Sequence, residues 1–369
     1  MSRGPPVEAQ KLEIRALRAR PVNVPMSRPL ETSGGAVSTA PLVLIDLETE
    51  QGVTGHSYVF GYAPLTLDPI VRLLQNLGDI LVGEQVAPAV IEERMAKTFR
   101  LIGMQGFAAM AVAGIDMAVW DALAKAAGLS LARLLGGAPR PIRAYNSNGL
   151  GILGAKAASE QARELVAEGF GAVKVRLGYP DINTDVAVVR AVRKAVGDEL
   201  LLMSDFNQSL SVTEAQQRIR HLDEEGLYWI EEPTRWDDYA GHAAIRNKAR
   251  TPIQTGENCW GPHEMAKALD AGACDYFMAD AMKIGGVTGW MRAVALAEPL
   301  GLPLSCHLFP QISAHLLSVT PTAHWLEFVD WADPILREPV AIEDGHAVIA
   351  DEPGAGIAWN EEAVARYLF

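Results

Sequence analysis

The chain has 369 residues, 49% of them hydrophobic, which is enough to bury the core of one large domain with a smaller one beside it. The formal net charge is −13 at pH 7 and no basic cluster stands out, so nucleic acid and an anionic membrane surface are poor candidates as partners. The three cysteines, Cys259, Cys274 and Cys306, lack metal-ligand spacing and are expected to be reduced thiols in a cytoplasmic protein.

The N-terminal region is expected to be antiparallel. Its strands are predicted from three runs, at residues 11–20, 41–50 and 53–60. A turn at Gln51 and Gly52 would join the last two strands. Residues 1–15 contain no apolar run of signal-peptide length, so no leader is expected.

A Pro/Gly/Ser-rich stretch at about residues 21–40 separates the first two predicted strands. Its length and composition predict a mobile loop, and long loops of this kind are often lids over a site. Within it, Arg28 and Glu31 offer polar contacts suited to a polyhydroxy substrate, unless both side chains face the solvent. Arg28 is therefore a candidate substrate-binding residue.

Residues 66–136 are expected to be helical. Their most apolar stretch, residues 106–128, is interrupted by Asp116 and Asp121. Charged side chains at these positions favour a helix packed inside a protein over one that spans a membrane, so no membrane partner is expected.

From about residue 140, short apolar runs alternate with amphipathic segments. The runs lie at residues 142–148, 172–178, 200–207, 227–233, 252–258, 276–283, 302–309 and 323–328. The segment 184–197 illustrates the intervening pattern, with Val186, Val189, Val192 and Val196 on one side of a helix. Alternating strands and helices predict a parallel sheet, and eight strands predict a closed α/β barrel.

Polar residues end these apolar runs. They are Lys174, Arg176, Asp205, Asn207, Glu231, Glu257, Asp280, His307 and Glu327. From Asp205 onward, the runs place one such position every 20 to 27 residues, which is the length of one strand-plus-helix unit. These residues should therefore meet at the C-terminal rim of the barrel, where such barrels carry out catalysis.

Three acids on consecutive strands, Asp205, Glu231 and Glu257, would repel one another without a cation between them. Carboxylate oxygens suit a hard divalent ion, and Mg²⁺ is the first choice because it keeps positions for water and substrate oxygens. The alternative is that each acid only caps the helix that follows it.

His307 is the best acid/base candidate, because the unperturbed pKa of histidine lies nearest neutrality. Asp280, at the end of the preceding strand, is placed to hydrogen-bond one ring nitrogen and select the tautomer. Glu327 faces the same rim and is a candidate proton donor to a substrate oxygen. The alternatives are a structural histidine and a simple salt bridge at Glu327.

Together these segments resemble the enolase superfamily, and within it the mandelate racemase family. The resemblance covers essentially the whole chain and includes "TAPLVLIDL", "VAGIDMAVWDALAK", "WIEEPT", "DAMKIGGVTGW" and "SAHLLSVTPTAHWLE". It implies a (β/α)7β modified TIM barrel with an α+β N-terminal capping domain. The implied division is a capping domain at 1–137, a catalytic barrel at 138–335 and a segment at 336–369 that packs back on the capping domain.

The resemblance also assigns roles. It implies Mg²⁺ on the three acids, a His307/Asp280 dyad that removes the α-proton of a carboxylate substrate, and a metal-stabilised enediolate. Lys174 would contact the substrate carboxylate and Glu327 its other oxygen, while Asn207 would contact the α-hydroxyl and Ser147 a further pocket position. Relatives form symmetric homo-oligomers, commonly octamers, so an oligomer is expected.

Arg176 departs from the racemase pattern, which has a lysine base at this position. A guanidinium has a pKa of roughly 13.8, so neutralising it at pH 7 costs on the order of 9 kcal/mol. Arginine is a poor base but a good clamp for a carboxylate or for developing negative charge. With one working base, dehydration of an acid sugar is favoured over racemisation, which needs both faces of the substrate.

Three alternatives remain open from the sequence. Racemisation of a 2-hydroxy acid is possible if Arg176 or a water carries the second proton. Lys283, three residues after Asp280, could supply another amine base, as in the muconate-lactonising relatives. An inactive barrel that serves as a binding protein is the third alternative.

Overall fold

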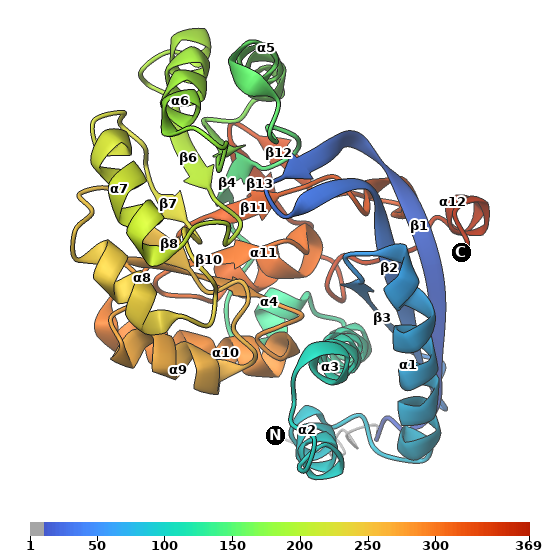
Figure 1. The fold of residues 1–369 in the computed structure, drawn as a ribbon. Helices are drawn as coiled ribbons and strands as arrows, with labels where there is room; N and C mark the ends of the chain where they lie inside the picture. The colour runs from blue at the N-terminus through green and yellow to red at the C-terminus, as the bar shows by residue number, and fades with distance from the viewer. Residues whose placement is uncertain (1–10) are drawn as a thin grey trace, which may run out of the picture.

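The computed structural model describes residues 11–369 and shows a three-stranded sheet with helices beside a barrel of parallel strands (Figure 1). Residues 1–10 lie outside the described residues. These ten residues include the start of the predicted capping domain. They also include much of residues 1–15, where no leader was expected.

The N-terminal sheet is antiparallel, as predicted. It contains β1 (Ile14–Thr32), β2 (Gly35–Thr49) and β3 (Thr54–Phe60), in that order, with the largely buried β2 at its centre. The predicted turn between β2 and β3 is confirmed. Gly52 in this turn has a φ of 79°, which glycine adopts without the steric cost of a Cβ atom.

The predicted loop at residues 21–40 is wrong in its secondary structure. β1 and β2 continue through this stretch and meet at Ser33 and Gly34, with one register irregularity between Pro25 and Leu30. β1 is an edge strand, where prolines are tolerated because one side of the strand forms no ladder hydrogen bonds. Pairing with β2 therefore outweighs the loop-like composition.

The tip of this hairpin reaches the barrel (Figure 1). Ser33 Oγ donates to the carbonyl oxygen of Phe206 at 3.0 Å, and the amide of Ile152 donates to the carbonyl oxygen of Glu31 at 2.7 Å. The hairpin thus rests on loops that follow barrel strands. Its movement as a lid stays a prediction.

Helices follow the sheet, as expected for residues 66–136. They are a 3₁₀ turn (Pro64–Thr66), α1 (Leu67–Leu81), α2 (Pro88–Thr98), α3 (Gly106–Ala127) and α4 (Leu131–Leu134). By length and composition α3 could cross a membrane, but 78% of its most apolar window is buried inside the protein. Asp121 on α3 accepts a hydrogen bond from the amide of Ala355 at 2.7 Å. The predicted packed helix is confirmed.

The barrel has all eight predicted strands. They are β4 (Ile142–Asn146), β5 (Ala172–Arg176), β6 (Leu201–Asp205), β7 (Ile230–Glu231), β8 (Ile253–Thr255), β9 (Tyr276–Asp280), β10 (Leu304–His307) and β11 (Leu326–Phe328). Neighbouring strands from β4 to β10 pair in chain order and in parallel, and β11 pairs with β4. Hydrogen bonds from the amide of Cys306 to Trp325 O (3.0 Å) and from that of His324 to Leu304 O (2.9 Å) close the ring.

Seven helices connect these strands, which gives the (β/α)7β order. They are α5 (Gly154–Ala167), α6 (Ile182–Val196), α7 (Val212–Leu222), α8 (Tyr239–Arg246), α9 (Pro262–Asp270), α10 (Gly286–Ala297) and α11 (Pro310–Ser318), with 3₁₀ turns at Glu298–Leu300 and Asp333–Ile335. In α6, Val189 and Val192 are buried while Val186 and Val196 pack against the same core at partial exposure. The predicted apolar side of this helix is confirmed.

A plug of mostly large hydrophobic side chains lies in the barrel interior. It consists of Tyr145, Ala172, Met203, Trp229, Met278 and Trp325, all at most 3% exposed. In each case the residue two positions later is a polar site candidate. They are Ser147, Lys174, Asp205, Glu231, Asp280 and Glu327. Because strand side chains repeat every two residues, the hydrophobic plug forms a floor beneath these polar groups.

The C-terminal segment contacts both parts of the molecule. β12 (Ala341–Glu343) and β13 (His346–Val348) form a hairpin that pairs with β4, whereas α12 (Glu361–Arg366) lies beside β1 (Figure 1). Trp359 Nε1 donates to Asp46 Oδ1 on β2 at 2.6 Å. The domain boundaries after residues 137 and 335 stay a prediction.

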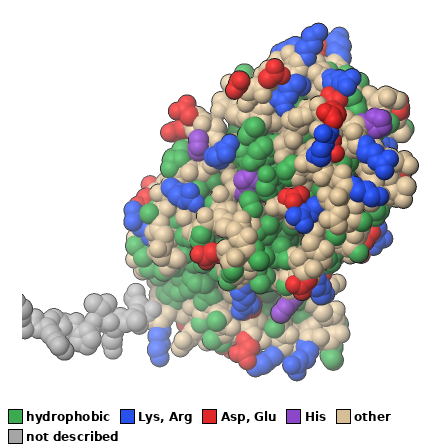
Figure 2. Space-filling model, turned by 90° about the vertical axis from the view of Figure 1, so that its left-hand side faces the viewer, with side chains coloured by type: hydrophobic (Ala, Val, Ile, Leu, Met, Phe, Trp, Pro, Cys, Tyr) green, Lys and Arg blue, Asp and Glu red, His purple; other side chains and the backbone are tan. Residues whose placement is uncertain are grey.

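Charges of both signs share the surface. On the face in Figure 2, Lys and Arg side chains are interspersed with Asp, Glu and hydrophobic ones. Ion pairs also join neighbouring parts of the barrel, such as Arg190 on α6 with Glu225 in the turn after α7, at 2.7 Å. On that face the charges are mixed rather than gathered into a patch of one sign.

Candidate active site

Polar residues from seven barrel strands meet at the C-terminal rim. They are Lys174 and Arg176 (β5), Asp205 (β6), Glu231 (β7), Glu257 (just after β8), Asp280 (β9), His307 (β10) and Glu327 (β11), and none is more than 8% exposed. The convergence follows from the parallel strand order, which places every strand end at the same edge.

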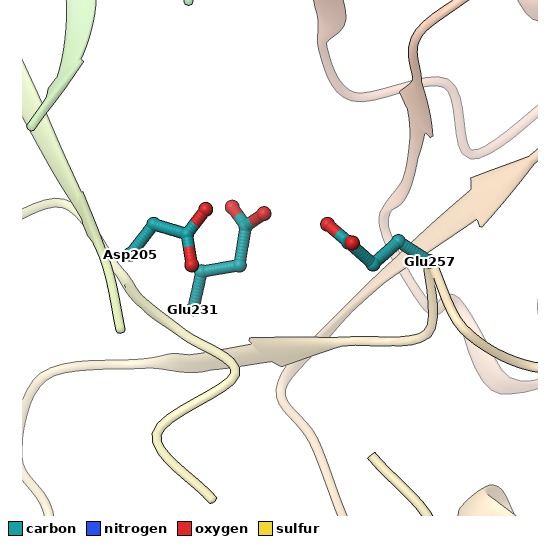
Figure 3. Close-up of side chains that lie close together, drawn as sticks. All are labelled: Asp205, Glu231 and Glu257. Atoms are coloured by element: carbon teal, nitrogen blue, oxygen red, sulfur yellow. The ribbon is translucent and has the colours of Figure 1, made fainter. Parts of the chain in front are cut away.

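Three carboxylates form a candidate metal centre. Asp205, Glu231 and Glu257 each offer an oxygen, and these oxygens lie within 4.8 Å of one another (Figure 3). Asp205 and Glu231 lie side by side and Glu257 points toward them from the opposite side. Burial, partly offset by Lys174 and aided by the neighbouring carboxylates, raises the pKa of Glu231 to about 8. A buried, oxygen-only cluster of negative charge fits Mg²⁺.

Lys174 lies among carboxylates. Its Nζ is 2.8 Å from Glu231 Oε1, 2.9 Å from Glu327 Oε1 and 3.3 Å from Asp205 Oδ2. Burial alone would lower the pKa of Lys174, but these carboxylates outweigh it and raise the pKa well above its usual value. The ammonium therefore carries its charge at neutral pH.

His307 and Asp280 are joined by a short hydrogen bond. Nδ1 of His307 lies 2.6 Å from Asp280 Oδ2, and Asp280 Oδ1 accepts from the amides of Met282 (2.7 Å) and Lys283 (2.9 Å). These donors hold the carboxylate in place, so Nδ1 carries the proton and Nε2 faces the site. Nε2 is 3.5 Å from Glu257 Oε2.

The surroundings of His307 favour the protonated ring. Burial alone would lower the pKa of His307, but the carboxylates of Glu257, Glu327 and Asp280 raise it to about 9. A cation held by Glu257 would oppose part of this effect, because it neutralises one of the charges that stabilise the imidazolium.

Glu327 is a hydrogen-bond acceptor in this arrangement. It accepts from Ser147 Oγ at 2.7 Å and from the amide of Leu308 at 3.0 Å. Burial alone would raise the pKa of Glu327, but Lys174 and His307 outweigh it and lower the pKa. Its predicted role as a proton donor stays a prediction that this arrangement does not favour.

Arg176 is held by neutral groups. Nη1 donates to the carbonyl oxygens of Ser147 and Gly149, and Nη2 donates to Ser147 Oγ, each at 2.8 Å. Nε is buried and has no hydrogen-bond partner among the described residues. Unlike Lys174, Arg176 makes no ion pair with a carboxylate in residues 11–369, so the charge of its guanidinium is left for another anion.

Asn207 also reaches the site. It has a φ of 44°, unusual for a residue with a side chain, and its Nδ2 donates to Asp205 Oδ2 at 3.1 Å. Its Oδ1 is buried and has no partner within residues 11–369. The amide oxygen is therefore available to a substrate hydroxyl.

Three other candidates lack the contacts expected of them. Arg28 pairs with Glu168 at 2.7 Å, at the end of α5, so its predicted contact with the substrate is not supported by its position. Glu31 is exposed. Nζ of Lys283 donates to Asn258 Oδ1 at 2.6 Å and lies 4.7 Å from the centre of the Tyr62 ring. These contacts do not favour the amine base proposed for Lys283.

Sequence reasoning missed three buried residues around the metal centre. Glu232 accepts two hydrogen bonds from Asn258 Nδ2, at 2.9 and 3.0 Å, and burial raises its pKa well above the usual value. Trp229 and Gln254 donate to Glu231. The amide of Gln254 inside an apolar run was a usable signal, whereas Trp229 had none, because an indole in a buried strand is ordinary core.

Family models match most of the chain. The model described as the N-terminal domain of mandelate racemase and muconate lactonizing enzyme matches residues 14–136. The model described as the enolase C-terminal domain-like family matches residues 157–363.

Individual proteins are similar over most of their length. An L-talarate/galactarate dehydratase of Salmonella typhimurium is 33% identical over 294 residues, 78% of this chain and 73% of the dehydratase. A D-galactarolactone cycloisomerase of Agrobacterium fabrum is 29% identical over 96% of this chain and 99% of its own. A Bradyrhizobium enolase, whose crystal structure is complexed with magnesium and mandelic acid, is 46% identical in sequence to this chain. The two structures superpose with a TM-score of 0.94, covering 98% of this chain and 99% of that chain.

Proposed function

The chain belongs to the mandelate racemase/muconate lactonizing enzyme family of the enolase superfamily, and from this premise we propose that it removes the α-proton of a 2-hydroxycarboxylate with His307. The chain is a lyase or an isomerase, and Mg²⁺ is its cofactor. The outcome that the site supports best is dehydration of an acid sugar.

Substrate binding is assigned to four residues. Asp205, Glu231 and Glu257 would hold Mg²⁺, which supplies a Lewis acid that withdraws charge from the substrate carboxylate. Lys174, buried and charged, would bind the same carboxylate. The α-hydrogen of the bound acid is thereby made more acidic.

Proton transfer is assigned to His307. Its Nε2 would take the α-proton, while the 2.6 Å hydrogen bond to Asp280 holds Nδ1–H and stabilises the imidazolium that forms. Protonated His307 would then give this proton to the 3-hydroxyl as the C3–O bond breaks. Water leaves, a C2=C3 enol remains, and its tautomerisation gives a 2-keto-3-deoxy acid.

Arg176 is the residue that favours dehydration over racemisation in this proposal. Its guanidinium is fixed by Ser147 and Gly149 and remains protonated, so the second face of the substrate lacks a base. Its charge can instead stabilise an anion. The single observation on which dehydration rests is this pairing of one His307/Asp280 dyad with an arginine in place of a second base.

Racemisation is the second candidate. The Bradyrhizobium enolase that is 46% identical to this chain holds magnesium and mandelic acid, an aryl 2-hydroxy acid. Mandelic acid has no 3-hydroxyl, so it cannot lose water by this elimination. A substrate of that kind would support racemisation, with a water as the second proton carrier.

The test is a panel of acid sugars and aryl 2-hydroxy acids incubated with the enzyme and Mg²⁺ in D₂O. Dehydration predicts 2-keto acid formation from at least one acid sugar. Loss of optical rotation without a keto acid would instead show racemisation. Absence of both products and of α-hydrogen exchange in every compound would support a binding protein on an inactive barrel.

Two further predictions concern the cell and the assembly. We expect a cytoplasmic homo-oligomer, with the octamer as the assembly common in the family. Size-exclusion chromatography with light scattering measures the assembly, and a monomeric mass would overturn this expectation.

A further inference from the structure

Two neutral side chains donate hydrogen bonds to the carboxylate of Glu231. Its Oε2 accepts from Trp229 Nε1 at 3.0 Å and from Gln254 Nε2 at 3.2 Å, while its Oε1 accepts from Lys174 at 2.8 Å. Trp229, Gln254 and Glu231 are all 0% exposed. Both oxygens of Glu231 are therefore oriented by groups within the barrel.

Rigid strand geometry places both donors. Trp229 precedes Glu231 by two residues and belongs to the plug of the barrel, so its side chain lies on the same side of the strand. Gln254 is the register partner of Glu231 in the pairing of β7 with β8. Gln254 lies within β8, and Trp229 immediately precedes β7, where its carbonyl oxygen accepts from the amide of Ser204 on β6 at 3.1 Å.

The fold alone does not explain Gln254. Its Oε1 is buried without a partner in residues 11–369, and its Nε2 is hydrogen-bonded to Glu231. Leaving a buried acceptor unpaired is unfavourable, so an apolar side chain of similar size would suit the barrel interior better. The presence of an amide at this position therefore indicates a role in binding the Glu231 carboxylate.

We propose that Trp229 and Gln254 are positioning residues that hold Glu231 in the orientation in which it binds Mg²⁺. This inference rests on the proposed role of Glu231 as a metal ligand. A buried carboxylate without these donors would have fewer hydrogen bonds to balance its charge and more freedom to turn. The bound ion would therefore be held less tightly.

The test measures Mg²⁺ affinity of the folded, chelator-treated enzyme by isothermal titration calorimetry. Trp229→Phe and Gln254→Met should each raise the Kd for Mg²⁺ by about 10- to 100-fold, the usual effect of losing a partner of a metal ligand. Gln254→Met keeps the side-chain length, so it serves if Trp229→Phe does not fold. At saturating Mg²⁺ the kcat of both variants should approach that of the unchanged enzyme. The Mg²⁺ concentration that gives half-maximal activity should stay raised.

Matched controls lie elsewhere in the core. Trp290→Phe removes a buried indole that donates to Thr320 Oγ1 at 3.1 Å, and Gln311→Met removes a buried amide that accepts from the Tyr58 hydroxyl at 2.7 Å. Both should leave the Kd for Mg²⁺ near that of the unchanged enzyme, whatever their effect on Tm.

Two outcomes are decisive. If Trp229→Phe and Gln254→Met bind Mg²⁺ as tightly as the controls, the positioning role is overturned. Glu231→Gln separates this result from a failure of the metal site. If that variant also binds Mg²⁺ normally, Glu231 is not a ligand and the proposed function loses its metal centre; if it binds weakly, only the positioning role fails.

Discussion

Arg176 donates to both the carbonyl oxygen and the hydroxyl of Ser147, each at 2.8 Å. Ser147 Oγ in turn donates to Glu327 at 2.7 Å. The guanidinium is thus part of a hydrogen-bonded chain that fixes its position at the rim. An arginine used in this way acts as a rigid positive charge and cannot exchange a proton with the substrate at neutral pH.

Replacing Arg176 by lysine should add a second base. A lysine amine can lose its proton when other cations lie nearby, so Arg176→Lys should allow α-proton exchange from the face that His307 does not serve. ¹H NMR in D₂O with each enantiomer of a turned-over substrate measures this exchange. Arg176→Met is the control and should show no second-face exchange. Exchange of both enantiomers by the unchanged enzyme would contradict the single-base scheme.

Removing either member of the dyad should strongly slow proton abstraction. Asp280→Asn leaves the shape intact but no longer fixes Nδ1–H, and His307→Asn removes the base, so each should lower the rate of α-proton exchange by about 10²- to 10⁴-fold. His242→Asn, a buried histidine in α8, is the control. Retention of full exchange by His307→Asn would assign the base to another residue.

Mg²⁺ should stabilise the fold as well as support catalysis. A ligand present at 100 times its Kd stabilises the state that binds it by about 2.7 kcal/mol, so adding Mg²⁺ to chelator-treated enzyme should raise Tm. Glu257→Gln should lose most of this gain and the activity. Asp237→Asn, on an exposed ion pair with Arg235, should keep both. An equal thermal gain in Glu257→Gln would place the ion elsewhere.

Arg28 should be dispensable for catalysis. Its guanidinium is engaged by Glu168 at a partly exposed ion pair, which contributes about 0–1 kcal/mol to stability. Arg28→Ala should therefore leave kcat/KM of the active substrate unchanged and lower Tm slightly. Glu168→Ala should also keep kcat/KM but lower Tm further, because Glu168 also accepts from the buried Asn146 Nδ2 at 2.8 Å. A large rise in KM in Arg28→Ala alone would restore its predicted contact with the substrate.

Two histidines that are buried in neutral form should lose their contribution to stability in mild acid, whereas the buried carboxyls of Asp116 and Asp333, whose pKa burial raises to about 7, change stability in the opposite sense. Burial lowers the pKa of both His315 and His324 to about 4, against about 6.5 when unfolded. Their contribution is full above pH 6.5 and is lost as pH falls to 4, because the unfolded chain binds protons in that window and the folded chain does not. Each accounts for up to about 3 kcal/mol.

Denaturant unfolding at pH 7, 5.5 and 4.5 measures this loss. Between pH 7 and 4.5 the unchanged chain should lose more free energy of unfolding, or gain less, than the double variant His315→Gln/His324→Gln. The same pH dependence in both proteins would mean that these histidines do not contribute to it.

The site could be predicted from the sequence because the barrel is built from local units. Each strand, its polar end and the helix that follows lie within about thirty residues, and parallel order brings every strand end to one rim. The convergence of Asp205, Glu231 and Glu257 therefore follows without any knowledge of long-range contacts, and the strand period of two explains why Asp205 and Glu231 lie above the plug residues Met203 and Trp229.

Only the tertiary structure decided how individual side chains are partnered. The Pro- and Gly-rich stretch at residues 21–40 is strand because its two halves, in β1 and β2, pair with each other and with the rest of β2, and Arg28 is engaged by Glu168, 140 residues away in the chain. Arg176 is fixed by Ser147, and Gln254 turns toward Glu231, through contacts between neighbouring strands. Composition and spacing report local preference, whereas these partners are chosen by atoms far apart in the chain that folding brings within hydrogen-bond distance.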